Sequence, residues 1–466
     1  MSRRTPASTP RWTAIRPGLY YGWYIVAFAV VANFVSGNYL FGVFLKPMTE
    51  ELGWSRGAFS LANTLSVVAT GSAGFIVGPL VDRYGGRWLV VGGAVIAGLA
   101  LMSLSVVHDL WQFLGLRGFL FAIGGVGMGP LVINVVLAKW FVRQRGRAIS
   151  LSAMGISAGG IVLAPLASLL TDSVGWRSAW LVFGALIWVV VIVPAAFIMK
   201  RQPEDIGLLP DGDTPESFAD IMKRQPEDIG LLPDGDTPES FAAARRGRGE
   251  MRSRSGALEQ HWTRAEAVRT KQLWMLVLAY GLGGLPSTAL MLHLIPFLQD
   301  NGFSAGVAAL LFAVLQGASF ISKPIWGYSL DRFEPRYLVA SGWSLKVVPL
   351  LLLPAVAGGY GVTSLILLLA VYGTGVGCTL VGQEVIWAHY FGRRHIGAVR
   401  SVALPFTLIF NAVGAWFAGR AWDVWGSYTE VFVLFASLSI VAIALVLLTS
   451  MPRSPARSTA DTIAET

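Results

Sequence analysis

The chain has little charge and almost no cysteine. Only 14% of its 466 residues are charged, whereas 54% are hydrophobic. Soluble domains carry about 25% charged residues, so this balance is typical of a protein that lies in lipid. The single cysteine, Cys378, excludes a disulfide framework and a cysteine-rich metal site. With only five scattered histidines as well, we expect no metal and no cofactor.

Several functional patterns are also missing. No segment has the GxxxxGK[ST] form of a phosphate-binding loop, so nothing in the sequence supports ATP-driven pumping. The net charge of +9 would suit nucleic acid, but the basic residues stand in short clusters between apolar runs, and we expect no nucleic-acid partner. A membrane enzyme or sensor is an alternative without support, because neither a cluster of catalytic residues nor a signalling domain is visible.

Long apolar runs dominate the rest of the chain. A membrane span needs about 20 mainly apolar residues, and its backbone must be helical because lipid offers no hydrogen-bond partners. Six such runs precede residue 200, at 22–45, 58–80, 88–107, 111–138, 148–171 and 178–199. Six more lie at 273–298, 304–330, 337–357, 361–388, 399–420 and 429–450. The sequence therefore predicts an all-α membrane protein with 12 transmembrane helices.

Lysine and arginine predict the orientation of these helices. If both termini are cytoplasmic, most of the basic residues fall in cytoplasmic segments, and only Lys46, Arg56 and Arg177 fall outside. Cytoplasmic loops normally carry this excess. We therefore expect a multi-pass protein of the inner (plasma) membrane with both termini in the cytoplasm, and the lipid bilayer is its expected surrounding. No feature requires an oligomer.

The polar segments divide the chain. We expect a cytoplasmic tail over 1–20, a six-helix bundle over 21–199, a cytoplasmic linker over 200–268, a second six-helix bundle over 269–450 and a tail over 451–466. The linker is rich in Pro, Gly, Asp and Arg, as connecting segments are. Residues 198–219 recur unchanged as 221–242. We interpret this as a tandem duplication that transport does not need.

The two halves also resemble each other at an offset of about 250 residues. Three pairs of segments correspond in order: 52–57 with 301–306, 78–87 with 327–336, and 140–143 with 390–393. Parallel repeats of this kind are related by an axis along the membrane normal, and they can rock about a central site. The sequence therefore predicts two pseudo-symmetric six-helix bundles and a transport function.

The second of these pairs has a recognisable sequence. Residues 78–87 read GPLVDRYGGR and residues 327–336 read GYSLDRFEPR. The first resembles the cytoplasmic loop signature of the major facilitator superfamily, and the second is a weaker copy. Aspartates there can accept hydrogen bonds from a helix N-terminus and from arginine. The resemblance implies a cytoplasmic gate formed by Asp82, Arg83, Arg87, Asp331, Arg332 and Arg336. Solvated loop charges are the alternative explanation.

Further motifs narrow the resemblance. The segments FGVFLKPM (41–48), ELGWSR (51–56), WFVRQRGRA (140–148), GQE (382–384) and YFGRRHIG (390–397) look like those of the bacterial monocarboxylate and oxalate/formate transporters. This likeness implies a secondary transporter of a small organic anion, coupled to a proton or exchanged for a counter-anion. Which acid is carried stays open. Export of a larger amphipathic or drug-like compound is the alternative within transporters.

The resemblance also implies where the anion binds. In that group a cation in the eighth span, commonly an arginine before a proline, holds the carboxylate; here the pair is Lys323-Pro324. The animal relatives place an aspartate one turn earlier, where this chain has Ser319. A charge inside a span costs roughly 2.5 to 3.5 kcal/mol, so Lys323 should face a cavity or have a partner. Snorkelling toward the cytoplasmic surface is the alternative.

Other polar residues within the spans complete the candidate site. Arg117 is either a second anion contact or a structural residue, Glu384 is a candidate for carrying a coupled proton, and Lys346 has no assigned role. The uncharged residues Asn38, Tyr39, Asn134 and Tyr372 are candidates for orienting the bound acid. Hydrogen bonding between helices is the default explanation for these four.

Overall fold

A computed structural model gives the structure of the chain. It describes residues 20–36, 40–141, 144–209, 211, 262–330, 332–359, 361–391 and 396–452. Within these ranges the structure is almost wholly helical and contains no strand. The predicted all-α class is confirmed.

The first half of the chain forms an N-terminal bundle. Its helices are α1 (Gly22–Val35), α2 (Leu40–Leu52), α3 (Arg56–Tyr84), α4 (Gly86–Leu104), α5 (Leu110–Phe113), η1 (Leu114–Leu120), α6 (Phe121–Met128), α7 (Pro130–Trp140), α8 (Arg145–Ile187), η2 (Trp188–Ile192) and α9 (Val193–Ile198). The first predicted span is α1 with α2, and the fourth runs from α5 to α7. The fifth and sixth are continuous in α8, except that Gly175, at φ +79°, turns the chain back between them.

The second half forms a C-terminal bundle. Its helices are α12 (Arg264–Val268), α13 (Lys271–Asp300), α14 (Ala305–Leu330), α15 (Pro335–Gly359), α16 (Gly361–Phe391), α17 (Ile396–Trp425) and α18 (Thr429–Leu448). After the short α12, each of these helices corresponds to one predicted span. The structure therefore has the predicted 12 transmembrane helices.

Nine segments of the described chain are long and apolar enough to cross a membrane, and one of them, residues 147–198, contains two spans. The two spans outside this set are α3 and α17, which pack against each other between the bundles.

The internal repeat is visible in the backbone. Gly53 and Gly302, which correspond in the two halves, have φ values of +69° and +89°. Gly175 and Gly426, at +79° and +68°, form a second pair at nearly the same offset. Positive φ favours glycine because it has no Cβ atom. Equivalent turns at equivalent places confirm that the two bundles are pseudo-symmetric.

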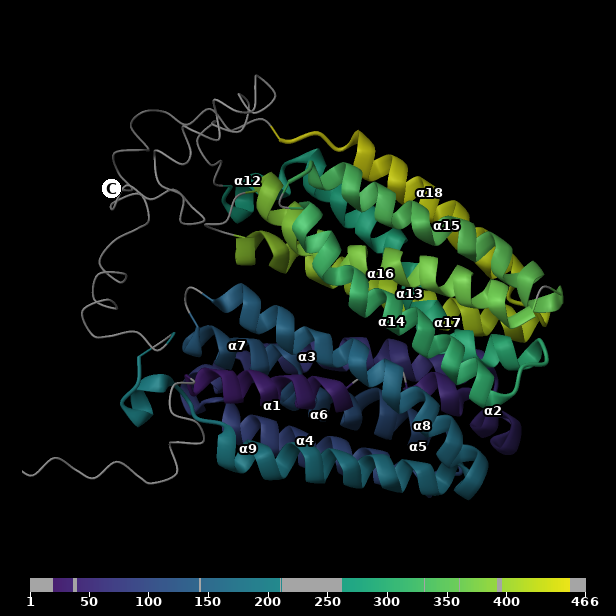
Figure 1. Ribbon diagram of the computed structural model, residues 1–466, viewed down its shortest axis with the longest axis horizontal. Helices are drawn as coiled ribbons and strands as arrows, with labels where there is room; N and C mark the ends of the chain where they lie inside the picture. Colours follow the sequence, from purple (N-terminus) through teal and green to yellow (C-terminus); the bar gives the residue numbers. More distant parts are fainter. Residues whose placement is uncertain are drawn as a thin grey trace, which may run out of the picture.

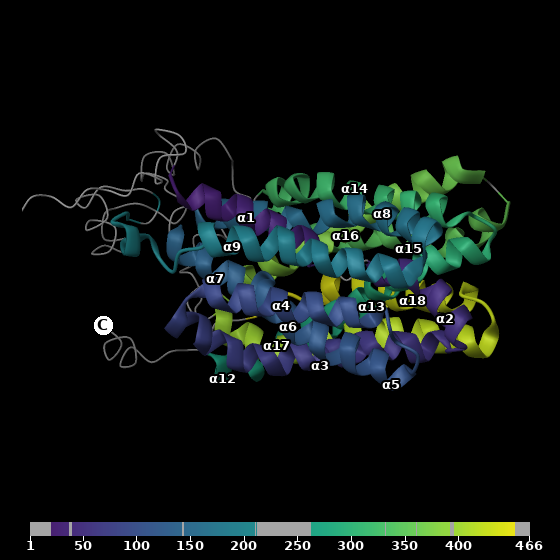
Figure 2. The same cartoon turned by 90° about the horizontal axis from the view of Figure 1, so that it is seen from below.

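The bundles lie side by side along their length, with α1 to α9 in one layer and α12 to α18 in the other (Figure 1). They meet where α3 packs on α17, α8 on α14, and α2 on α13; Figure 2 shows the first two of these pairs. We call this contact the seam. The linker end of the molecule is the end at which α9 finishes and α12 begins. The far end is the opposite one, with the four glycine turns.

The start of the linker packs on the N-terminal bundle. A short 3-10 helix, η3 (Pro203–Ile206), buries Pro203, and Ile206 and Leu208 contact the core. The Asp211 carboxylate accepts a hydrogen bond of 3.2 Å from the backbone N–H of Gln144, next to the start of α8. Part of the first copy of the duplicated segment therefore packs on the N-terminal bundle. The second copy, 221–242, lies outside the described residues.

Candidate substrate site at the seam

The side chain of Lys323 reaches across the seam. Its Nζ atom on α14 donates a hydrogen bond of 2.7 Å to Ser157 Oγ on α8, in the other bundle. Gln316 stands seven residues earlier on α14, two turns along the same face, and it packs against Gly160, three residues after Ser157. A polar face of the C-terminal bundle therefore lies directly on the N-terminal bundle.

This contact lies at mid-depth. Ser157 is 12 residues after the start of α8 and 18 before the break at Gly175, which places it roughly 18 Å from the linker end and 27 Å from the far end at 1.5 Å per residue. Side chains on a helix lean toward its N-terminus, and α14 begins at the far end, so Lys323 leans toward the middle of the molecule. Its observed contact is with the seam and not with the linker end.

Several buried polar atoms lie on the helices of the C-terminal bundle near this site. Tyr372 Oη on α16 interacts with Ser287 on α13, whereas Gln316 Oε1 on α14 and Asn411 Oδ1 on α17 have no hydrogen-bond partner among the described residues. Gln316 and Tyr372 are only 2% and 1% exposed. A buried polar group without a partner typically costs about 1 to 3 kcal/mol, so such groups call for water or a ligand.

Arg117 is fully buried in the N-terminal bundle, within the π-helical turn η1. It donates to Ser66 Oγ at 2.5 Å, and its guanidinium stacks 3.8 Å from the centre of the Phe41 ring. Arg117 is seven residues from the far-end start of α5, or about 10 Å, whereas Lys323 is 18 residues along α14, or about 27 Å. The structure therefore does not bring the two cations to one depth.

Lys346 lies inside the C-terminal bundle, with no exposed surface. Its Nζ atom donates to the Gly283 carbonyl on α13 at 2.9 Å and to Thr379 Oγ1 on α16 at 3.2 Å. Lys346 therefore connects α15 to α13 and α16 within the C-terminal bundle. Sequence reasoning gave this residue no role, and the contacts explain how its amine is accommodated.

The predicted candidates for orienting the acid are only partly described. Asn134 is half-buried on α7, and Tyr372 is buried on α16. Asn38 and Tyr39 lie outside the described residues, as does the side chain of Glu384. The roles suggested for these last three stay predictions.

The predicted gate residues are only partly described. The side chain of Asp82 and the whole of Asp331 lie outside the described residues. The four arginines contact residues of their own bundle: Arg83 stacks on Tyr84, Arg87 on Trp88, Arg332 on Tyr328, and Arg336 lies 3.7 Å from Glu334. The gate therefore stays a prediction.

A second feature of the seam was missed by sequence reasoning. At the far end Arg56, which begins α3, donates to the Asp300 carboxylate at the end of α13 with distances of 2.6 and 3.0 Å. The same guanidinium donates to Tyr428 Oη at 2.9 Å and stacks 3.7 Å from the Trp422 ring. Lys46 of α2 adds a third bond to Asp300, at 3.0 Å.

The same cluster includes a carboxylate at a helix N-terminus. Asp423 of α17 accepts hydrogen bonds of 2.8 Å from the backbone N–H groups of Arg56 and Gly57. These groups start α3 and would otherwise have no intrahelical partner. We call Arg56, Asp300, Asp423, Tyr428 and the neighbouring His293 the far-end lock. Arg56 was visible in the sequence as one of three basic residues at this end, but its partners lie 244 or more residues away.

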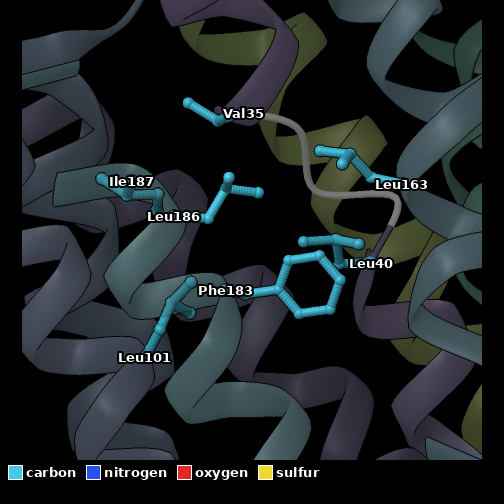
Figure 3. Close-up of a pocket in the computed structure, with 7 residues that line it drawn as sticks. All are labelled: Val35, Leu40, Leu101, Leu163, Phe183, Leu186 and Ile187. Carbon is cyan, nitrogen blue, oxygen red and sulfur yellow. The ribbon is translucent and has the colours of Figure 1, made fainter. Parts of the chain in front are cut away.

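The N-terminal bundle also encloses an apolar gap. The described residues that line it are all apolar: Val35, Leu40, Leu101, Leu163, Phe183, Leu186 and Ile187 (Figure 3). These side chains offer nothing to orient an anion. We therefore place the candidate site at Lys323 and not in this gap.

Comparison with known families agrees with this architecture. The family model described as Major Facilitator Superfamily matches residues 26–399 and again 276–465. The chain belongs to the major facilitator superfamily. Members of this family are transporters, and the buried polar face at the seam of this transporter lies where the two halves of such a protein meet.

Individual relatives agree on the family but differ in what their names say. The oxalate:formate antiporter of Oxalobacter formigenes is 23% identical over 72% of this chain and 69% of its own length. An MFS-type transporter, pynF, of Aspergillus niger is 29% identical over 39% of this chain, and the fujikurins efflux protein of Gibberella fujikuroi is 26% identical over 41%. This chain spans only 43% and 42% of the length of those two fungal relatives.

A solved structure has the same fold. The bacterial homolog of the human lysosomal transporter Spinster, in an inward-facing and unoccupied conformation, superposes with a TM-score of 0.68. The superposition covers 92% of this chain and 97% of that one at 16% sequence identity. This similarity supports the 12-helix arrangement.

Proposed function

We propose that this transporter moves a small organic anion across the membrane by alternating access, and that Lys323 holds the anion's carboxylate. The observation that carries the proposal is the Lys323–Ser157 hydrogen bond, which places a cation at mid-depth between the two bundles. Central sites between repeats are where secondary transporters bind their substrates. The oxalate:formate antiporter among the relatives supports an acid as cargo.

The geometry gives Lys323 a partner that can be exchanged. Ser157 supplies a neutral oxygen, whereas a carboxylate supplies a full negative charge, which adds a Coulomb attraction to the hydrogen bond that the ammonium makes. An entering anion can therefore replace Ser157 at Lys323 Nζ. The ammonium is a compact charge with little geometric selection, so it suits several small acids. The buried oxygens of Tyr372 and Gln316 are candidates for binding hydroxyl or protonated groups of the substrate.

The orientation and coupling follow the sequence-based expectations. We propose that the linker end faces the cytoplasm, with residues 1–20, 200–268 and 451–466 on that side of the inner membrane. The contacts of the far-end lock join the bundles on the opposite side, so the described conformation is closed there. Coupling is to a proton, with Glu384 as its candidate carrier, or to a counter-anion, and the loops around Asp82 and Asp331 form the cytoplasmic gate.

The test is uptake by the purified protein in proteoliposomes. Labelled formate, oxalate, lactate and pyruvate are offered with and without an inward proton gradient or an internal counter-anion. We expect saturable uptake of at least one acid, lost in Lys323→Gln and partly kept in Lys323→Arg. Lys346→Gln is the matched control, because it removes a buried lysine that lies away from the seam. Uptake by Lys323→Gln at the normal rate would exclude this lysine from the site.

Export of a larger amphipathic compound is the second candidate. The similarity to a fujikurins efflux protein favours it. The same vesicles separate the two functions: gradient-driven movement of a drug-like dye, together with no uptake of any of the four acids, would support export and contradict the proposal above.

A further inference from the structure

His293 lies buried in the far-end lock, at the seam. It is on α13, seven residues before Asp300, and is 1% exposed. Its ring contacts both bundles, because Nε2 lies 3.1 Å from Ser60 Oγ on α3 and 2.9 Å from the Ala415 carbonyl on α17. The Nδ1 atom lies 3.0 Å from Tyr428 Oη on α18. Separation of the bundles at this end would therefore expose the ring to water.

The hydrogen bonds around the ring suit its neutral form. The Ala415 carbonyl can only accept, so Nε2 is the donor toward it, and Ser60 donates its own hydroxyl proton to the Arg56 carbonyl. Tyr428 Oη accepts from Arg56, so its own proton is free to be donated to Nδ1. With the proton on Nε2 and Nδ1 as acceptor, every contact of the ring is satisfied without a second ring proton.

The charged group next to the ring is a cation. Tyr428, the N-cap residue of α18, accepts from the Arg56 guanidinium of α3 and contacts Nδ1, so Arg56 and His293 share this one oxygen. The carboxylates of Asp300 on α13 and Asp423 on α17 bind Arg56, and Lys46 of α2 binds Asp300. A second ring proton would turn Nδ1 into a donor facing Tyr428 Oη, and it would place a positive charge one hydroxyl group away from the Arg56 guanidinium.

We propose that His293 is a proton-binding site that fills only when the far end is open, so that acid on that side favours the open state. A water-exposed imidazole has a pKa of about 6.5. Because a ligand that binds only one of two states shifts the equilibrium toward it, the ratio of open to closed molecules should rise about tenfold per pH unit well below that value. This inference concerns a proton and the lock alone, so it does not depend on the substrate proposed above.

The experiment measures the width of the far end against pH. Spin labels are placed at the exposed residues Ser173 on α8 and Ser304 before α14, in full-length protein with Cys378→Ser, reconstituted into lipid nanodiscs without substrate. Pulsed electron spin resonance gives the distance between the labels from pH 8 to pH 4. We expect a second, longer distance in the parent protein whose population relative to the first is constant at high pH and rises by up to tenfold per pH unit below about pH 6.5, and no such rise in His293→Gln.

The controls keep the result interpretable. His108→Gln removes an exposed histidine at the same end, away from the lock, and should titrate like the parent protein. His293→Asn serves if His293→Gln does not fold. Three results would each overturn the proposal: a parent protein whose distance does not change with pH, a ratio of the two distances that begins to rise only near pH 4, in the ordinary range of carboxylic acids, or an unchanged titration in the folded His293 variants.

Discussion

Arg56 and Asp300 stand 244 residues apart in the chain and join the two bundles with hydrogen bonds of 2.6 and 3.0 Å. Neither residue belongs to the candidate substrate site. Their pairing closes one end of the seam while Lys323, near the middle, remains the cation between the bundles. The far-end lock and the candidate substrate site are therefore separate clusters, and a substitution can change one of them without changing the other.

The first prediction concerns the lock. Asp300→Asn removes one charge of a largely buried pair whose carboxylate is 24% exposed. Allowing for this exposure, the closed state should lose about 1 to 2 kcal/mol, or roughly five- to thirtyfold in population. Distances between far-end spin labels at pH 8 measure this shift. Glu51→Gln is the matched control, because Glu51 pairs with Arg177 of its own bundle. An equal shift in both variants would contradict a lock across the seam.

A second prediction separates binding from packing at Tyr372. Its buried hydroxyl interacts with Ser287 of α13, so Tyr372→Phe should lower the melting temperature by no more than a few degrees. If the hydroxyl contacts the substrate, KM should rise about two- to twelvefold, the loss expected for one hydrogen bond of about 0.5 to 1.5 kcal/mol. Uptake kinetics and thermal melting in detergent check the two parts. A lower melting temperature with an unchanged KM would assign Tyr372 to packing.

The partly buried Lys323 and the fully buried Lys346 should behave differently, which is the third prediction. Lys346→Met replaces an amine enclosed by α13, α15 and α16 with an apolar chain of similar length, which removes the cost of burying the amine but also removes its hydrogen bonds to the Gly283 carbonyl and Thr379. Because these two effects offset each other, we expect uptake within about twofold of normal and a melting temperature changed by only a few degrees. Lys323→Met should abolish uptake. Loss of proton-driven uptake in Lys346→Met, with exchange retained, would show that Lys346 takes part in coupling.

The fourth prediction concerns the linker. Deletion of residues 220–242 removes the second copy of the duplication and leaves Pro203, Ile206, Leu208 and Asp211, which pack on the N-terminal bundle. Uptake per molecule should stay within about twofold of the full-length protein. Removing residues 203–211 as well should reduce the amount of folded protein in the membrane, as size-exclusion chromatography would show. A loss of uptake in the single deletion would give the second copy a function.

The sequence predicts features that arise from neighbouring residues in the chain, but not contacts between residues that are far apart in it. The spans, the internal repeat and the family follow from apolar runs and local motifs, because lipid permits only helices of a given length. Lys323 could be singled out because a charged side chain inside a membrane span is costly and usually has a functional role. The far-end lock could not be predicted from the sequence. Its members Arg56, Asp300 and Tyr428 come from different segments in both bundles, and no local sequence pattern marks any of them. Likewise, nothing in the sequence could show that Arg117 lies on Phe41 at another depth.

The internal repeat has a consequence at the far end. Glu51 and Asp300 occupy corresponding positions in the two halves, as do Arg177 and Tyr428. In the N-terminal half the acid pairs with its local arginine. In the C-terminal half Tyr428 stands in the place of that arginine, and the acid, Asp300, pairs with Arg56 of the other bundle. Duplication thus supplied two copies of one ion-pair position: the first can stay intact throughout the transport cycle, whereas the second must break each time the protein admits solute from this side.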